Sequence, residues 1–175
     1  MKRAPRIARY RHLVLAAVIA LGGCGFHPRG ASPLPAIMEH TYIDFAQPYD
    51  ELSRAVRAEL SAGGAEIVDK KEHASAVLSM SDHRVDQRVL SVGRSAKATE
   101  YEMFEEISFS LKDAKGTVLL EPQKLRTTRD YVFDETQLLG KVEESEELRQ
   151  DMRQSLARQM LDRIRAGLAA KEEKR

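Results

Sequence analysis

The order and spacing of apolar residues predict an α+β fold in which two helices pack on one face of a four-stranded, mostly antiparallel sheet. Over residues 98–111, apolar and polar residues alternate with the period of a half-buried strand. Residues 48–64 and 143–169 instead repeat their apolar residues every three or four positions, as amphipathic helices do. The order strand, helix, strands, helix then favours consecutive strands that pair with each other, with both helices on the same side.

The first predicted strand and helix follow each other directly. The segment TYIDFA, residues 41–46, alternates and is rich in β-forming residues, which predicts a strand. Apolar residues then recur at helical spacing over residues 52–60, with Pro48 suited to the first turn. Gly63-Gly64 suits the C-terminal cap of this helix. The segment AEIVD that follows, residues 65–69, is compatible with a short strand.

Three long strands are predicted next, over residues 76–92, 98–111 and 117–133. The turn KDAKGT joins the last two, because Gly116 can take a positive φ, and Pro122 marks a bulge or an edge position. We therefore expect an antiparallel meander. In its first strand the residues expected to share a face are Leu78, Met80, Leu90 and Val92. In its second strand they are Tyr101, Met103, Ile107, Phe109 and Leu111, with Glu100, Glu102, Glu106, Ser108 and Ser110 on the other face.

A long helix is predicted over residues 143–169, close to the end of the chain. Its acidic start, EESEE, complements the positive end of the helix dipole. An apolar stripe would hold it against the sheet, and with both helices on one side, the opposite sheet face is expected to be more polar. The stripe consists of Leu148, Met152, Leu156, Met160, Leu161, Ile164 and Leu168.

The N-terminal segment resembles a lipoprotein signal. Five cations and no acidic residue precede an apolar run at residues 13–21, which is too short to span a bilayer as a helix, since that takes roughly 20 residues. The run is followed by Leu21-Gly22-Gly23-Cys24, which resembles the bacterial lipobox, where the cysteine becomes the lipid-bearing N-terminus. Cys24, the single cysteine, is therefore the predicted lipidation site. The alternative is an ordinary signal peptide with an incidental cysteine.

Four segments follow from this interpretation. Residues 1–23 form the signal peptide, and residues 24–36, rich in Gly and Pro, form the lipidated N-terminus and its tether. The α+β domain is expected over residues 37–170, with a charged C-terminal tail at residues 171–175. Gly25 stands where lipoproteins retained in the inner membrane often carry aspartate, so the class rule assigns the protein to the outer membrane.

Charge and motifs exclude several classes of function. Residues 24–175 carry 23 Lys and Arg against 27 Asp and Glu, a net charge of −4, which does not suit a nucleic-acid-binding protein. Of the five histidines, the three beyond the tether are scattered, and HExxH, CxxC and G-x-S-x-G motifs are absent from the sequence. We therefore predict no enzyme, no catalytic residue, no metal site and no cofactor.

Two predicted connections carry cations. Arg94 and Lys97 lie between two long strands, and Lys141 lies just before the last predicted helix. Exposed cations on turns usually serve solubility alone. They are also the groups that a phosphate-bearing ligand requires, because Arg presents a planar fork to phosphate and Lys a point charge.

The chain resembles the LptE family of lipopolysaccharide-assembly lipoproteins over nearly its whole mature length. The resemblance rests on the mature start CGFHPRG followed by Leu34-Pro35, on LSRAVRAEL, on an arginine six residues before Glu100-Tyr101, and on QDMRQSLARQML. Pro28 departs from the family, whose members commonly carry leucine there. The resemblance implies two helices against a four-stranded sheet.

The resemblance also implies a function without catalysis. Family members sit as a plug in the lumen of the outer-membrane β-barrel LptD, and the two together deliver lipopolysaccharide to the cell surface. The family's lipopolysaccharide-contacting cations match Arg94 and Lys141, and Lys97 lies beside the first of them. The implied partners are LptD, lipopolysaccharide and the membrane that holds the lipid anchor. The alternative is an accessory lipoprotein of another outer-membrane barrel-assembly complex.

Overall fold

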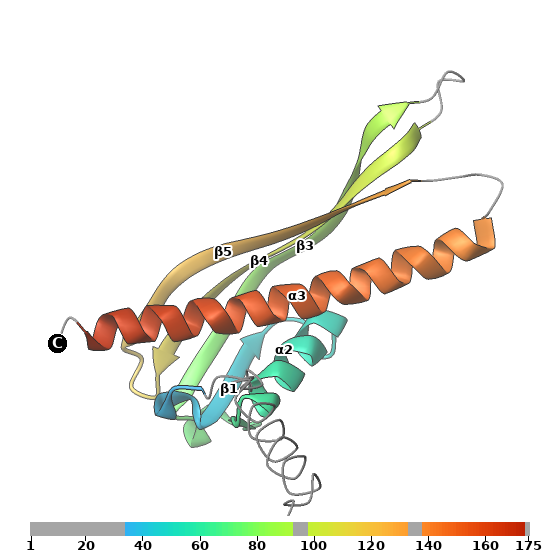
Figure 1. Cartoon of the computed structure of the whole chain (residues 1–175). Helices are drawn as coiled ribbons and strands as arrows, with labels where there is room; N and C mark the ends of the chain where they lie inside the picture. Colours follow the sequence, from blue (N-terminus) through green and yellow to red (C-terminus); the bar gives the residue numbers. More distant parts are fainter. Residues whose placement is uncertain (1–33, 93–97, 133–137, 174–175) are drawn as a thin grey trace, which may run out of the picture. The chain divides into compact units, whose positions relative to one another are not determined.

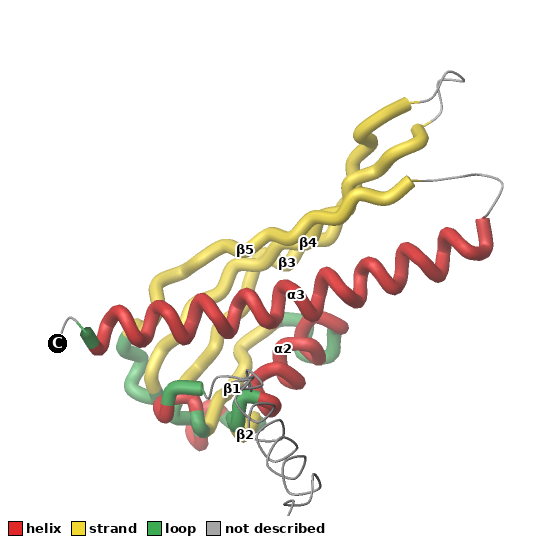
Figure 2. Tube along the Cα trace, in the orientation of Figure 1, coloured by secondary structure: helices red, strands yellow, loops and turns green. Residues whose placement is uncertain are grey.

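The computed structural model describes residues 34–92, 98–132 and 138–173. Cys24, Arg94 and Lys97 lie outside these residues. Along the chain the elements are η1 (Ala36–Met38), β1 (His40–Phe45), α2 (Glu51–Ala62), β2 (Glu66–Ile67), η2 (Lys71–His73), β3 (Ala76–Val92), β4 (Ala98–Asp113), β5 (Val118–Val132) and α3 (Leu138–Glu172) (Figures 1 and 2).

The sheet has five strands in the order β2-β1-β3-β4-β5. β3, β4 and β5 form the predicted antiparallel meander, whereas β1 is parallel to both β2 and β3. The α+β class is confirmed, but the predicted strand count was one too low. The added strand is the short β2, which α2 brings back beside β1, because a helical crossover is what joins two parallel neighbours.

Both helices pack on the same face of the sheet, as predicted. In Figure 1, α3 crosses in front of the long strands and α2 lies beside it. Gly167 lets α3 approach closely, since a Cβ built there would lie 2.5 Å from Leu120 Cδ1 of β5. The buried core consists of Leu52, Val56 and Leu60 of α2, Leu156, Met160, Leu161 and Ile164 of α3, and Ile43, Leu78, Met80, Ile107, Phe109 and Leu111 of the sheet.

Local signals fixed several boundaries. Pro48, predicted for the first turn, precedes α2, which begins at Glu51; Asp50 caps it, because its side chain accepts a hydrogen bond from the Ser53 amide. Gly116 has φ 86° in the β4–β5 turn, as expected. Pro122 lies on the edge strand β5, where the register with β4 shifts between Phe109 and Leu111.

The last helix is longer than predicted. It begins at Leu138 rather than at Glu143, and it runs to Glu172, two residues into the expected charged tail. Lys141 therefore lies in the first turn of α3 and not in the loop before it.

A bulge in β3 changes which residues face the helices. Ser81 pairs with Ser108, but the next pair is Arg84 with Glu106, so two β3 residues lie opposite one β4 residue. Asp82, inside the bulge, has φ 54°. Beyond it the side-chain parity is reversed, and Val89, opposite Tyr101, continues the face of Leu78 and Met80. Two further register shifts, between Val89 and Ser91 and between Ser91 and Val92, follow it, so the predicted continuous face from Leu78 to Leu90 and Val92 is not formed.

Candidate functional site

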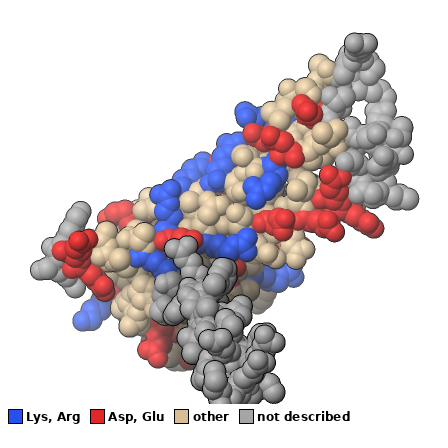
Figure 3. Space-filling view, viewed as in Figure 1, with Lys and Arg blue, Asp and Glu red and all other residues tan. Residues whose placement is uncertain are grey.

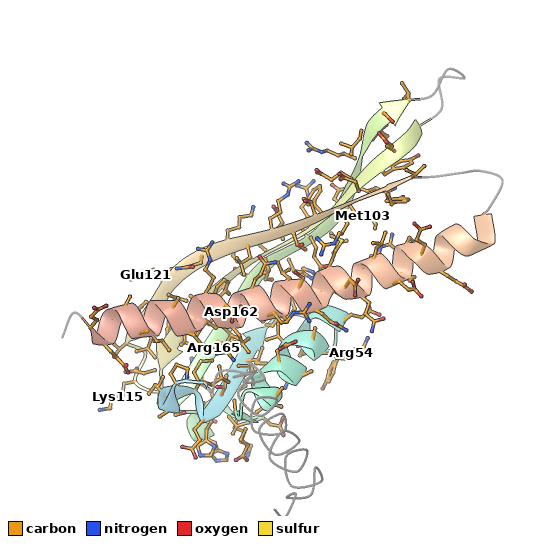
Figure 4. All side chains as sticks on the ribbon, viewed as in Figure 1. Arg54, Met103, Lys115, Glu121, Asp162 and Arg165 are labelled. Carbon is orange, nitrogen blue, oxygen red and sulfur yellow. The ribbon has the colours of Figure 1, made fainter. Side chains whose placement is uncertain are left out.

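The bulge divides the three long strands into two parts. We call residues 84–92, 98–106 and 126–132 the distal sheet, and the remaining residues of these three strands the basal sheet. Figure 1 shows the ends of β3 and β5 and the starts of β4 and α3 at the distal end, whereas α2, β1 and the β4–β5 turn lie at the other. Lys115 of that turn and Met103 of the distal sheet are labelled in Figure 4.

The predicted ligand-binding cations are part of, or adjacent in sequence to, elements that begin or end at the distal end (Figure 1). Arg94 and Lys97 lie between β3 and β4, and outside the described residues, so their contacts stay a prediction. Lys141 lies in the first turn of α3, and its side chain is also outside what the structure describes. The elements on either side of these positions end together at the distal end (Figure 2).

The distal sheet face that points away from the helices carries a ladder of ion pairs. Arg88 Nε lies 2.8 Å from Glu102 Oε1, and Lys124 Nζ, from the adjoining basal part of β5, lies 3.0 Å from Glu106 Oε1. Arg126 lies between these two glutamates, 3.7 and 3.9 Å from them. Glu102 and Glu106 do face outward, as predicted, but they neutralise cations rather than only solvate the strand.

An aromatic ring interrupts this ladder. The guanidinium carbon of Arg126 lies 3.9 Å from the centroid of the Phe104 ring, and that of Arg84 lies 5.5 Å from it. Such stacking contributes about 0.5–1 kcal/mol at exposed sites. Arg84 also bonds Asp86 at 2.7 Å, and this bond holds the pKa of the Asp86 carboxyl below its usual range. On this face, Arg84 and Arg126 are therefore held by contacts with the Phe104 ring and with neighbouring carboxylates.

Apolar side chains are exposed mainly on the distal sheet. Among the described residues, five of the seven large exposed apolar side chains lie there: Val85, Val89, Leu90, Val92 and Val132, between 45% and 65% exposed. Tyr101 and Tyr131 stack nearby with ring centroids 5.4 Å apart. Exposed apolar groups gathered in one region usually mark a contact surface.

Acidic side chains predominate in the groove between α2 and α3 and over the N-terminal part of α3, whereas basic side chains line β5 (Figure 3). Figure 3 shows acidic side chains gathered over the N-terminal part of α3, and Lys and Arg along the side formed by β5. A groove of about 750 Å³ between α2 and α3 is lined by four glutamates, among them Glu59 and Glu146, and by two arginines, Arg54 and Arg153. Its excess of carboxylates disfavours a phosphate-bearing ligand.

A buried charge cluster was not predicted. Glu105 lies on the helix-facing side of β4 with a side chain only 1% exposed. His83, in the β3 bulge, places Nε2 2.8 Å from Glu105 Oε1 and Nδ1 3.0 Å from Asp50 Oδ2. The bond to Glu105 raises the pKa of His83, and Asp50 adds to this, while burial opposes it. The only signal in the sequence was that Glu105 interrupts the apolar alternation of β4.

Residues 34–92, 98–132 and 138–173 contain neither a membrane-spanning helix nor a metal-binding cluster. No helix there is long and apolar enough to cross a membrane. Groups of His, Cys, Asp or Glu arranged to hold a metal ion are absent from the same residues. The contacts of His83 with Asp50 and Glu105 are ion pairs.

Comparison with known proteins decides the family. The family model LptE, described as lipopolysaccharide-assembly, matches residues 38–164. The chain belongs to the LptE family. The match runs from η1 through most of α3, so it covers both the basal and the distal sheet.

Named relatives and solved structures agree with the LptE assignment. The LPS-assembly lipoprotein LptE of Photorhabdus laumondii is 29% identical over 159 residues, 89% of this chain and 86% of the relative. That of Pectobacterium atrosepticum is 29% identical over 152 residues, 85% and 80% of the two chains. The NMR structure of lipoprotein B from Nitrosomonas europaea superposes with a TM-score of 0.71 at 29% identity, covering 86% of this chain and 96% of that one. Rare lipoprotein B from Shewanella oneidensis gives 0.61 at 28%, covering 77% and 97%.

Proposed function

We propose that this chain is an outer-membrane lipoprotein that forms the plug of an LptD-type barrel, binds lipopolysaccharide and supports its assembly at the cell surface. The observation that carries the proposal is the family match over residues 38–164, because relatives aligned over most of their length bear the name LPS-assembly lipoprotein. The chain would act by binding and positioning, without catalysis.

Cys24 is the proposed anchor. Each buried methylene of an acyl chain contributes about 0.8 kcal/mol to membrane attachment, and one chain alone binds only reversibly. A lipobox cysteine normally receives three chains, which would hold the protein stably at the membrane.

The distal sheet suits a plug. Within the described part of the chain, no helix covers its outward face, which carries paired Arg and Glu side chains, such as Arg126 with Glu102 and Glu106 (Figure 1). The lumen of an outer-membrane barrel is polar, so a charged but locally neutralised face can enter it without burying unpaired charge. The ladder would therefore contact the barrel wall.

The competing function is that of an accessory lipoprotein in another barrel-assembly complex. Affinity purification of the chain from the outer membrane in mild detergent separates the two. One large barrel protein recovered in stoichiometric amount supports the plug. A complex of several lipoproteins around a different barrel rejects it.

Lipopolysaccharide binding is assigned to Arg94, Lys97 and Lys141. A hydrogen bond to a charged group contributes about 1.5–3 kcal/mol, so Arg94→Asp combined with Lys141→Asp should weaken binding at least about tenfold. The loss should shrink in high salt because the contact is electrostatic. Binding of residues 25–175 to purified lipopolysaccharide, measured beside circular dichroism, tests this.

The matched control for that experiment reverses the charge of two lysines outside the proposed binding site. Lys70 and Lys115 are exposed, and neither is in the distal sheet, because Lys70 precedes η2 and Lys115 lies in the β4–β5 turn. Lys70→Asp with Lys115→Asp changes the net charge by the same amount. The control should bind lipopolysaccharide like the unmodified chain. Equal losses in both double variants would show that net charge alone governs binding and would remove the assigned site.

A further inference from the structure

The cluster around His83 joins three parts of the fold. Asp50 Oδ1 accepts a hydrogen bond of 2.6 Å from the Ser53 amide and so caps α2, while its Oδ2 faces His83. His83 lies in the bulge of β3, and its other ring nitrogen contacts Glu105 of β4. One imidazole therefore links the first turn of α2 to two strands.

This linkage depends on the proton count of the ring. A neutral imidazole donates from one nitrogen and presents a lone pair at the other, whereas the imidazolium donates from both. Both nitrogens of His83 face carboxylate oxygens, at 2.8 and 3.0 Å. Only the protonated ring carries the positive charge that pairs with both carboxylates, and without the proton, two carboxylates would face an uncharged ring in a poorly solvated site.

Among the described residues, the ion pairs of the His83 ring are made with carboxylates alone. The charged groups that face the ring are Asp50 from α2 and Glu105 from β4. β1 contributes the ring of Phe45, whose centroid lies 6.1 Å from that of His83. In β3 itself, Asp82 accepts a bond from the Ser81 hydroxyl and Arg84 pairs with Asp86. The neighbouring residue on β5, Thr127, opposite Glu105, is buried and uncharged.

The contact extends to the other helix. Glu51, the first residue of α2, pairs with Arg153 of α3, whose side chain is 17% exposed. A change in the first turn of α2 would therefore also reach α3, the helix whose first turn holds Lys141.

We propose that His83 is a proton-dependent switch. When the ring is protonated, its ion pairs with Asp50 and Glu105 hold the first turn of α2 against the β3 bulge. When the ring loses the proton, these ion pairs are lost and the first turn of α2 becomes less stable. The pKa of His83 is raised above 6.5, its ordinary value, mainly by the bond to Glu105. A raised pKa means that the stabilisation is fully present below pH 6.5 and is lost as the pH rises through the folded-state pKa.

The test uses the full-length protein in mild detergent between pH 6 and pH 9. Hydrogen exchange detected by mass spectrometry gives protection factors, corrected for the intrinsic pH dependence, for a peptide spanning residues 50–56. In the unmodified protein, we expect protection of this peptide to fall about tenfold over the range, as loss of one charged hydrogen bond implies. The thermal midpoint should fall in parallel.

Two variants remove one partner of the His83 cluster each, and a third changes a histidine outside it. His83→Gln should show low protection that no longer varies with pH. Asp50→Asn retains a good N-cap residue but loses the charge, so its pH dependence should be weaker than that of the unmodified protein while α2 stays folded. His73→Gln, at an exposed histidine, should behave like the unmodified protein. Protection that is equally flat with pH in the unmodified protein and in His83→Gln would overturn the proposal.

Discussion

The basal and distal sheets are built from the same three strands but differ in what holds them. In the basal sheet, side chains such as Leu78 and Phe109 are at most 1% exposed beneath two helices. In the distal sheet, Val85 and Val89 are about half exposed, and the opposite face is a ladder of ion pairs around Phe104. Since buried apolar area contributes far more to folding than exposed ion pairs do, the basal sheet should provide the stability. The distal sheet is then free to serve as a contact surface.

The largest effect should come from the helix that covers the basal sheet. Leu156 of α3 is fully buried, so Leu156→Ala removes apolar contacts and leaves a cavity that together cost about 2–5 kcal/mol. The thermal midpoint should fall clearly. Arg163→Ala, at an exposed position of the same helix, should leave it nearly unchanged. Equal shifts of the thermal midpoint in the two variants would show that Leu156 is not part of the core between α3 and the basal sheet.

The basal elements were predictable because their signals are local. β3 begins and ends at the predicted residues, and the alternation of β4 and the stripe of α3 correctly identified core residues such as Ile107 and Leu156. Where apolar residues recur with a regular period, the pattern itself predicts which side of the strand or helix is buried.

The bulge and the charge cluster were not predictable in this way. Asp82 and His83 are polar residues in a polar stretch, and nothing in their pattern marks the extra residue that reverses the parity of β3. Glu105 is buried only because His83 and Asp50, distant in sequence, meet it in space. The predicted ligand cations Arg94 and Lys97 lie outside the described residues, so sequence and family resemblance remain their support.

A smaller effect is expected from the charged face of the distal sheet. Arg126→Ala removes the stack on Phe104, at 3.9 Å, and two long ion pairs, and should cost about 1 kcal/mol. Arg126→Lys keeps the charge but loses the planar stack, so it should recover only part of the loss. Urea unfolding at low and high salt separates the two contributions, because only the ion pairs are screened. A loss as large as that of Leu156→Ala would mean that the distal face is part of the stabilising core.

The smallest effect on stability should come from the distal valines. Val85 and Val89 are 48% and 51% exposed on the helix-facing side, opposite Glu105 and Tyr101 of β4. Replacing both by threonine keeps the branched Cβ that favours strands and removes only partly exposed methyl groups. Each change should stay within about 0.5 kcal/mol, the usual range for surface substitutions.

The informative comparison is with one basal residue changed in the same way. Val77 of β3 is 2% exposed, so Val77→Thr buries a hydroxyl, and urea unfolding should show a loss of about 1–3 kcal/mol. If the double distal variant lost as much, the distal sheet would need its apolar side chains for folding. If it keeps its stability, these valines are exposed without a folding role, as expected of side chains that a partner covers.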